Sequence, residues 1–244
     1  MGKRTTQQAR GKGSGTFRVR PRAYRYKIIY PSLKSNGAAK IIKLFNSSGH
    51  TSPLAEIQMV NLSLENEKIK FIIPAANGIY EGQEVYVGKR PENISIQNGD
   101  ILMLKDIAVG TKVFNVETVP GKGGKLIRSG GNSATISSDD NNIIELQIKK
   151  RKIKLNQNCR AVVGVISSDG RLMKPLVKAG KHHHMMKAVG RKWHRISAVK
   201  SNAVDHPFGS GRGKRIKSKI AKRNAPPGAK VGHIRPRKTG RKKI

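Results

Sequence analysis

The sequence predicts a mostly-β protein, with two adjacent small β-barrels between long basic N- and C-terminal extensions. Three observations predict this arrangement. Short apolar stretches of alternating polarity fill the middle of the chain, turn-forming residues separate them, and basic residues concentrate at both ends. Alternation with a period of two indicates half-buried strands, and many short strands between turns favour barrels or sandwiches. No segment carries a convincing apolar stripe over three helical turns.

The first 36 residues form the basic N-terminal extension, which holds 10 basic and no acidic residues. Its first ten residues, MGKRTTQQAR, lack the apolar stretch of a secretory signal peptide. No apolar run in the chain approaches the ~20 residues of a membrane-spanning helix. We therefore expect a soluble, intracellular protein without a membrane partner.

Residues 37–106 and 107–173 carry the strand patterns of the two barrels. Val85 and Val87, for example, alternate with polar neighbours, and turn residues such as "SDDNN" (138–142) separate one stretch from the next. The expected strands cover residues 39–45, 53–62, 68–75, 84–88, 100–104, 112–119, 132–137, 143–148, 151–155 and 159–166.

A change of charge and the turn at 109–111 place the boundary between the barrels near residue 107. Residues 37–106 hold 7 basic and 8 acidic residues, whereas residues 107–173 hold 11 and 5. Two small barrels fit the strand pattern better than one large sandwich. We expect residues 37–173 to fold alone and both extensions to be disordered without their partner.

The C-terminal extension, residues 174–244, holds 22 basic residues and one acid, Asp205. The whole chain has a net charge of +36, and a surface that repels itself this strongly indicates a polyanionic partner. Glycine and proline allow close backbone approach, while lysine and arginine neutralise phosphates. Nucleic acid is therefore the expected partner. Charge alone does not choose RNA over DNA, although a chromatin-like protein would have no need of two barrels.

Two motifs suggest small-ligand chemistry, and their spacing argues against it. "PGKGGK" (120–125) resembles a phosphate-binding loop, but Leu126 stands where a magnesium-binding serine or threonine is needed. "KHHHMMK" (181–187) contains three adjacent histidines that point in different directions, with no nearby cysteine or acid to complete a metal site. The single cysteine, Cys159, excludes a disulfide framework. We expect no metal, no cofactor and no small-molecule substrate.

Trp193, in "GRKWHR" (190–195), is the one tryptophan of the chain and lies among cations. Its ring could stack on a base, or it could anchor the C-terminal extension to the second barrel. The sequence leaves both interpretations open.

Asp205 and His206 stand side by side in "VDHPFGSGRG" (204–213). An acid beside an imidazole suggests acid–base catalysis, whereas glycines with cations suggest backbone laid against phosphate. Catalysis needs a third group and a pocket, and adjacent residues of an extended chain point to opposite faces. We therefore expect His206 to hold RNA in place, and Asp205 to bond a base edge, a backbone N–H or an arginine such as Arg212.

Five longer stretches follow one another along the chain and together resemble a known family. They are "GKGGKLIRSGGNSATI", "LNQNCRAVVGVIS", "KPLVKAGKHHH", "NAVDHPFGSGRG" and "RNAPPGAKVGHIRPRKTG". In this order they resemble the universal large-subunit ribosomal protein L-two family, with matches from residue 2 to residue 241. "HPFG" and "RNAPPG" resemble its archaeal and eukaryotic branch. The chain departs from the family pattern at 48–52, at 197–202 and at Ser210, so it resembles a divergent member.

The resemblance implies an OB-fold barrel followed by an SH3-like barrel, and extensions that penetrate ribosomal RNA. It implies a structural protein rather than an enzyme: a primary binder of large-subunit rRNA in the cytoplasmic ribosome, supporting assembly and subunit association. The implied partners are this rRNA, neighbouring ribosomal proteins and the small subunit across an intersubunit bridge. The C-terminal extension would approach the peptidyl transferase centre, where His206 matches a long-debated histidine. The resemblance also implies possible hydroxylation of His184.

The residues expected to contact rRNA are cationic, aromatic or part of the motifs around Trp193 and His206. They are Lys3, Arg4, Arg10, Lys12, Arg18, Lys122, Lys125, Arg128, Lys181, His184, Arg191, Lys192, Trp193, Arg195, Asp205, His206, Arg212, Lys214, Arg215, Arg223, Lys230, His233, Arg235 and Arg237.

Overall fold

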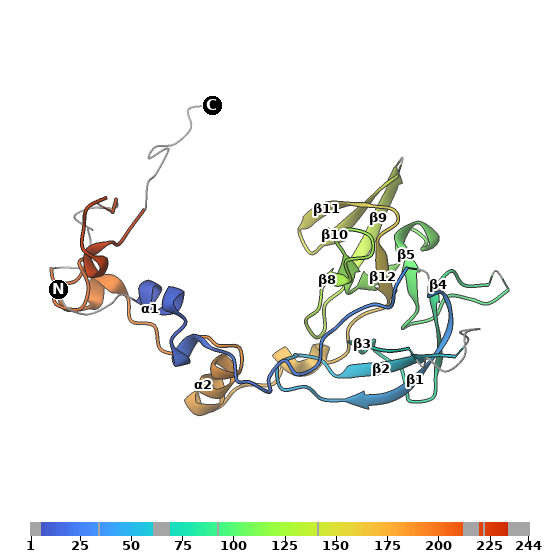
Figure 1. Ribbon diagram of the computed structural model, residues 1–244, viewed down its shortest axis with the longest axis horizontal. Helices are drawn as coiled ribbons and strands as arrows, with labels where there is room; N and C mark the ends of the chain where they lie inside the picture. Colours follow the sequence, from blue (N-terminus) through green and yellow to red (C-terminus); the bar gives the residue numbers. More distant parts are fainter. Residues whose placement is uncertain are drawn as a thin grey trace. The chain divides into compact units, whose positions relative to one another are not determined.

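The computed structural model describes residues 6–33, 35–60, 69–91, 93–140, 142–211, 220–221 and 223–233. The chain divides into two compact units. We call Pro21–Val177 the barrel unit, and we call Met1–Arg20 together with Lys178–Ile244 the terminal unit. The described strands lie in the barrel unit, and the α-helices α1 (Thr6–Lys12) and α2 (Ala179–Ala188) lie in the terminal unit (Figure 1). The prediction of a mostly-β protein is confirmed.

Each of the ten stretches expected to be extended contains a strand. The strands are β1 (Gly37–Phe45), β2 (Leu54–Met59), β3 (Lys70–Pro74), β4 (Glu84–Gly88), β5 (Ile101–Met103), β6 (Lys112–Phe114), β7 (Val116–Glu117), β8 (Gly124–Leu126), β9 (Ala134–Asp140), β10 (Ile143–Ile148), β11 (Arg151–Asn156) and β12 (Arg160–Val163). The expected strand at 112–119 is divided into β6 and β7 by Asn115, whose φ of 49° is left-handed. Strand β8 was not expected, because it lies within the glycine-rich loop.

Ten of these strands form one continuous sheet, in the order β11-β10-β9-β6-β12-β5-β4-β1-β2-β3. Strand β12 returns from the end of the barrel unit to the middle of this sheet, where it pairs antiparallel with β5 and with β6. Strands β7 and β8 pair separately. The last strand in sequence is therefore the one that joins the two halves of the sheet (Figure 1).

Two hydrophobic cores lie against this central pair of strands. Ile101 and Val162 belong to the first core, whereas Leu102, Ala161 and Val163 belong to the second. Because successive side chains of a strand point to opposite faces, β5 and β12 contribute to both cores at once. Strand β12 is buried at all four positions for this reason. The individual OB-fold and SH3-like assignments, and the boundaries at residues 36, 106 and 173, stay predictions.

A buried ion pair joins β7 to β12. The Glu117 carboxylate accepts hydrogen bonds from the Arg160 guanidinium (Nη2 to Oε1, 3.0 Å) and from the Arg160 backbone N–H (3.0 Å). Glu117 is fully buried and the Arg160 side chain is 2% exposed. The backbone N–H groups of Gly121 and Gly123 also donate to this carboxylate. The glycine-rich loop therefore surrounds an anion, and that anion is the protein's own Glu117.

The N-terminal segment before β1 completes this network. Arg160 Nη1 donates to the Pro31 carbonyl (2.8 Å), and the Arg160 guanidinium lies over the Tyr30 ring at 5.1 Å. The buried Tyr30 hydroxyl donates to the Asn115 carbonyl, and burial, followed by the charge of Glu117, raises the pKa of this phenol well above its usual value. The structure therefore places the segment from Pro21 onward in the same unit as the strands, which the sequence pattern did not predict.

A second buried ion pair lies in the first half of the sheet. Asp100 is fully buried, pairs with Arg90 and accepts hydrogen bonds from the Tyr86 and Gln97 backbone N–H groups. The Arg90 guanidinium also lies over the Tyr86 ring, 4.7 Å from its centre. Two acids of the barrel unit are thus neutralised internally. None of the described helices is long and apolar enough to cross a membrane.

We expect Arg160→Met to destabilise the barrel unit by about 3–5 kcal/mol, because it leaves the Glu117 carboxylate buried without its cation. Urea unfolding of the full chain measures this loss. The matched control is Lys152→Met, which removes an exposed lysine 3.4 Å from Glu145 and should cost less than ~1 kcal/mol. Equal effects of the two substitutions would show that the buried pair has no special role.

Candidate nucleic-acid interface

Helix α2 carries the three-histidine motif of the terminal unit. It ends in a Schellman motif: the Gly190 N–H donates to the Lys187 carbonyl and the Arg191 N–H donates to the Met186 carbonyl. Gly190 has the left-handed φ of 66° that this cap requires, and a Cβ there would lie 3.0 Å from the Phe17 carbonyl oxygen. The cap therefore fixes where α2 ends and lets the N-terminal segment pass close to it.

One face of α2 packs on Trp193. His182 and Met186, four residues apart, share this face and are less exposed than their neighbours. The ring centres of His182 and Trp193 are 3.8 Å apart. The ring centre of His194, the next residue in the chain, is 5.1 Å from that of Trp193. Trp193 therefore helps to fold the terminal unit itself. The sequence had left open whether it stacks on a base or anchors the extension.

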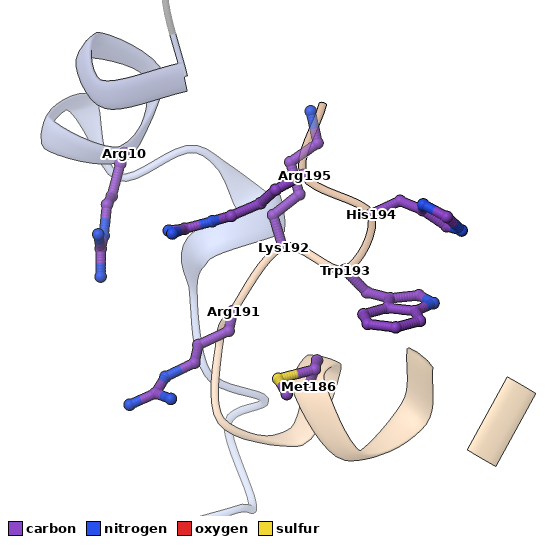
Figure 2. Close-up of a pocket in the computed structure, with 7 residues that line it drawn as sticks. All are labelled: Arg10, Met186, Arg191, Lys192, Trp193, His194 and Arg195. Carbon is purple, nitrogen blue, oxygen red and sulfur yellow. The ribbon is translucent and has the colours of Figure 1, made fainter. Parts of the chain in front are cut away.

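A pocket of about 600 Å³ lies beside Trp193. Figure 2 shows Trp193 and Met186 along part of its wall, with Arg10 approaching from α1. Arg191, Lys192 and Arg195 also line it, so an aromatic and apolar surface is combined with four cations. This combination suits a nucleotide, because the base has an apolar face and the phosphate is anionic. The pocket unites five residues that the sequence singled out: Arg10, Arg191, Lys192, Trp193 and Arg195.

Helix α1 positions Arg10 within its last turn. The helix is followed by Gly13, whose φ is 73° and whose N–H donates to the Arg10 carbonyl. Arg18 folds back to donate from Nε to the Gly13 carbonyl at 2.7 Å. Arg10 and Lys12 stand at the C-terminal end of the helix, where cations are favoured by its dipole.

The stretch around His206 closes into a compact loop, so the expectation of an extended chain is wrong here. The Ser210 N–H donates to the Ser201 carbonyl, and the Gly209 N–H donates to the His206 carbonyl. A Cβ on Gly209 would lie 2.2 Å from the Ser201 carbonyl oxygen, so glycine is required by close packing. The loop presents Asp205 exposed and His206 half-buried.

The His206 ring is held inside this loop. The Phe208 N–H donates to His206 Nδ1 at 3.1 Å, and the two aromatic rings lie 5.1 Å apart. Because Nδ1 accepts this hydrogen bond, the neutral imidazole carries its proton on Nε2. While this bond is made, the neutral ring has a donor at Nε2 and no free acceptor nitrogen. A polar pocket of about 590 Å³, lined by Lys200, Asn202 and residues on either side of them, lies next to the loop.

A second turn follows at residues 220–233. The Ala221 N–H donates to the His233 carbonyl, and a short 3-10 helix spans Pro227–Ala229. Arg223, Lys230 and His233 are exposed on this turn. They are available for contacts with a polyanion.

Three expected residues lie in the barrel unit. Lys122 and Lys125 are exposed on the glycine-rich loop. The backbone of this loop is fixed by the hydrogen bonds that Gly121 and Gly123 donate to the Glu117 carboxylate. Arg128 is half-buried near His50, and burial, followed by the charge of Arg128, lowers the pKa of His50. The loop is therefore a fixed support for its lysines, and its amides are not free to bind a nucleotide phosphate.

Two of the expected residues lie on α2 but do not line the pocket, and others lie outside the described residues. Lys181 and His184 are exposed on α2, and His184 lies edge-to-face with His183 at 5.5 Å. Across the described residues, no cluster of three or more His, Cys, Asp or Glu side chains is placed to hold a metal ion. The expected residues that lie outside the described residues are Lys3, Arg4, Arg212, Lys214, Arg215, Arg235 and Arg237.

The sequence interpretation missed one cationic element. The hairpin of β10 and β11 carries Lys149, Lys150, Arg151 and Lys152 at its tip, all exposed. The run KKRK was visible in the sequence, and its position between two alternating strands would have placed it on a turn.

Comparison with known proteins identifies the family. A family model described as "Ribosomal Proteins L2, C-terminal domain" matches residues 97–228. The large ribosomal subunit protein uL2 of Archaeoglobus fulgidus is 41% identical, over 98% of this chain and 99% of its own length. The chain belongs to the ribosomal protein L2 family. Two further members of the family, both named large ribosomal subunit protein uL2, come from Methanococcus maripaludis (39% identical, over 99% of this chain and 100% of the relative) and Sulfolobus acidocaldarius (36% identical, over 99% of each).

We expect Gly209→Ala to weaken binding to large-subunit rRNA by about tenfold, because a Cβ that opens the His206 loop costs ~1–3 kcal/mol of backbone strain. A filter-binding titration of the full chain measures this loss. The control is Gly180→Ala in α2, where a Cβ would meet no atom within 4 Å. Alanine favours a helix over glycine, so this control should bind as well as the wild type. Wild-type affinity of the Gly209 variant would contradict the role of the loop.

Proposed function

We propose that the protein is a structural constituent of the large ribosomal subunit, in the cytoplasm, where it binds large-subunit rRNA. The observation that carries the proposal is the pocket of the terminal unit, which is lined by a tryptophan and four cations. Near full-length similarity to proteins named for the large ribosomal subunit supports it. The rRNA contacts in this proposal are the residues named in the sequence analysis. Those in the described part of the chain include members of the pocket, the His206 loop, the turn at 220–233 and the glycine-rich loop.

The barrel unit serves as a folded support. In this proposal, residues 37–106 form the OB-fold barrel and residues 107–173 the SH3-like barrel, with the extensions 1–36 and 174–244 reaching into rRNA. Neighbouring ribosomal proteins contact the barrel surfaces, and the small subunit is reached across an intersubunit bridge. The exposed His184 side chain is accessible to a modifying enzyme before assembly.

His206 has a positioning role in this proposal, not a catalytic one. A general base must offer an unprotonated nitrogen to the proton that it removes. His206 Nδ1 already accepts from the Phe208 N–H, and Nε2 carries the ring proton while that bond is made. The Nε2–H is suited to donate to a phosphate or a base acceptor. This arrangement favours a protein that supports the architecture around an RNA catalytic centre.

Sedimentation of ribosomes washed in high salt tests the proposed function. We expect the native protein to co-migrate with the large subunit and to be absent from the small subunit. Association with chromatin, or quantitative release at moderate salt while other large-subunit proteins remain bound, would overturn the proposal. A polycation attached by charge alone would be released in this way, because its binding falls steeply with salt.

The role of His206 is tested with His206→Gln, which removes the imidazole and keeps a polar side chain. Assembled particles with full occupancy of the variant should form peptide bonds within roughly tenfold of the wild-type rate, below the ~10²–10⁴-fold that a positioned general base contributes. The rate is measured at substrate saturation across pH. A larger loss, with disappearance of a titration near neutral pH, would show that His206 moves a proton.

A further inference from the structure

The tip of the β10–β11 hairpin concentrates positive charge on a rigid part of the barrel unit. Lys149 and Lys150 form the two-residue turn, since Ile148 pairs with Arg151 across it. Lys152 and Lys154 continue along β11, the edge strand of the sheet. All five cations are exposed. The hairpin belongs to the barrel unit and includes none of the residues assigned to the glycine-rich loop.

The turn keeps a lysine where the backbone favours glycine. Lys149 has a φ of 55°, in the left-handed region, and its carbonyl accepts a hydrogen bond from Gln147 Nε2 (3.3 Å). Two-residue hairpin turns with such a conformation normally use glycine or asparagine. Among the described residues outside glycine that have a positive φ, Lys149 is the one lysine. A strained cation at an exposed hairpin turn suggests that its charge is used.

Among the described residues, the one acid that pairs with a cation of the tip is Glu145. Asp139 is paired opposite Ile144, five residues along β10 from Lys149, which corresponds to ~16 Å of strand. Glu145 lies nearer and is 3.4 Å from Lys152. Within the described part of the chain, no ion pair joins an acid to Lys149, Lys150 or Arg151. These three cations form the end of a hairpin whose base is anchored in the second core through Ile144 and Leu146.

We propose that this hairpin tip is an additional RNA-binding site, at which Lys149, Lys150 and Arg151 contact phosphates of the RNA backbone. A protein partner is less well matched, because its energetic anchors are commonly aromatic or apolar side chains, and the tip from 149 to 152 has none. Two lysines and an arginine on adjacent positions instead match closely spaced phosphates. The proposal rests on the proposed function, since the probe is large-subunit rRNA.

The test compares Lys149→Gly with the wild-type full chain. Glycine relieves the left-handed strain, so the midpoint of thermal unfolding should be unchanged or higher. Affinity for large-subunit rRNA should nevertheless fall roughly fivefold to tenfold in ~0.1 M salt, with a salt slope smaller by about 0.7–0.9, as loss of one phosphate contact requires. Lys149→Arg keeps the cation and should restore both values. A substitution that is neutral or favourable for folding thus separates binding from stability.

Adding Lys150→Gln and Arg151→Gln to Lys149→Gly should lower the salt slope by about 2–3 in total. Hydroxyl-radical footprinting of the complex should lose protection at one rRNA segment while the remaining protections persist. Lys105→Gln, which removes an exposed lysine next to Asp106, is the charge-matched control and should leave the footprint unchanged. The proposal is overturned if the triple variant keeps the wild-type affinity, salt slope and footprint. It is overturned equally if the variant keeps these values and instead fails to bind an acidic neighbouring protein. If the wild-type chain itself does not bind this rRNA, the proposed function fails.

Discussion

The buried pair of Glu117 and Arg160 is the interaction on which the barrel unit depends. Four separate segments meet at it: the chain before β1 through Tyr30 and Pro31, strand β7, the glycine-rich loop through Gly121 and Gly123, and strand β12 through Arg160. Strand β12 in turn joins the two halves of the sheet and contributes to both cores. Without its partner, either charge would be left in an apolar interior at a cost of several kcal/mol.

The same pair shows where part of the scarce negative charge of a chain with a net charge of +36 is placed. Acids are scarce, and the structure uses two of them, Glu117 and Asp100, inside the fold, each against an arginine. Outside the core, the cations of the terminal unit, the glycine-rich loop and the β10–β11 hairpin are left available for an external polyanion. Folding and binding therefore draw on different charges of the same chain. This separation fits a protein whose folded part supports segments that are shaped by RNA.

The sequence predicted the strands well, whereas the order of the strands in the sheet was not predicted. Alternation is a local signal, so Val85 and Val87 or Ile144 and Leu146 marked their strands directly. The return of β12 to the centre of the sheet is a pairing between distant segments, which no local pattern reports. Helix α2 was missed because its histidines and methionines form no apolar stripe, although Gly190 was a readable cap. Strand β8 was missed because it is three residues long and begins with glycine.

The candidate binding residues, like the strands, were recognised from local sequence, whereas their arrangement in space was not. Cations and Trp193 were recognised from composition, but the pocket that unites Arg10 with Arg191 depends on two segments that are far apart in sequence. The Asp205–His206 pair looked like acid–base chemistry in sequence. The hydrogen bond from Phe208 to His206 Nδ1, on which the proposed positioning role rests, depends on the closed loop. The hairpin tip was visible as KKRK and gained its meaning from the turn geometry of Lys149.

A density map of the large ribosomal subunit from the source cells tests the central claim most directly. The account predicts one copy of this chain, with the Glu117–Arg160 pair intact in the barrel unit and with rRNA in contact with the Trp193 pocket, the His206 loop and the hairpin tip. A map in which the chain is absent from the subunit, or in which these three surfaces face solvent, would contradict it.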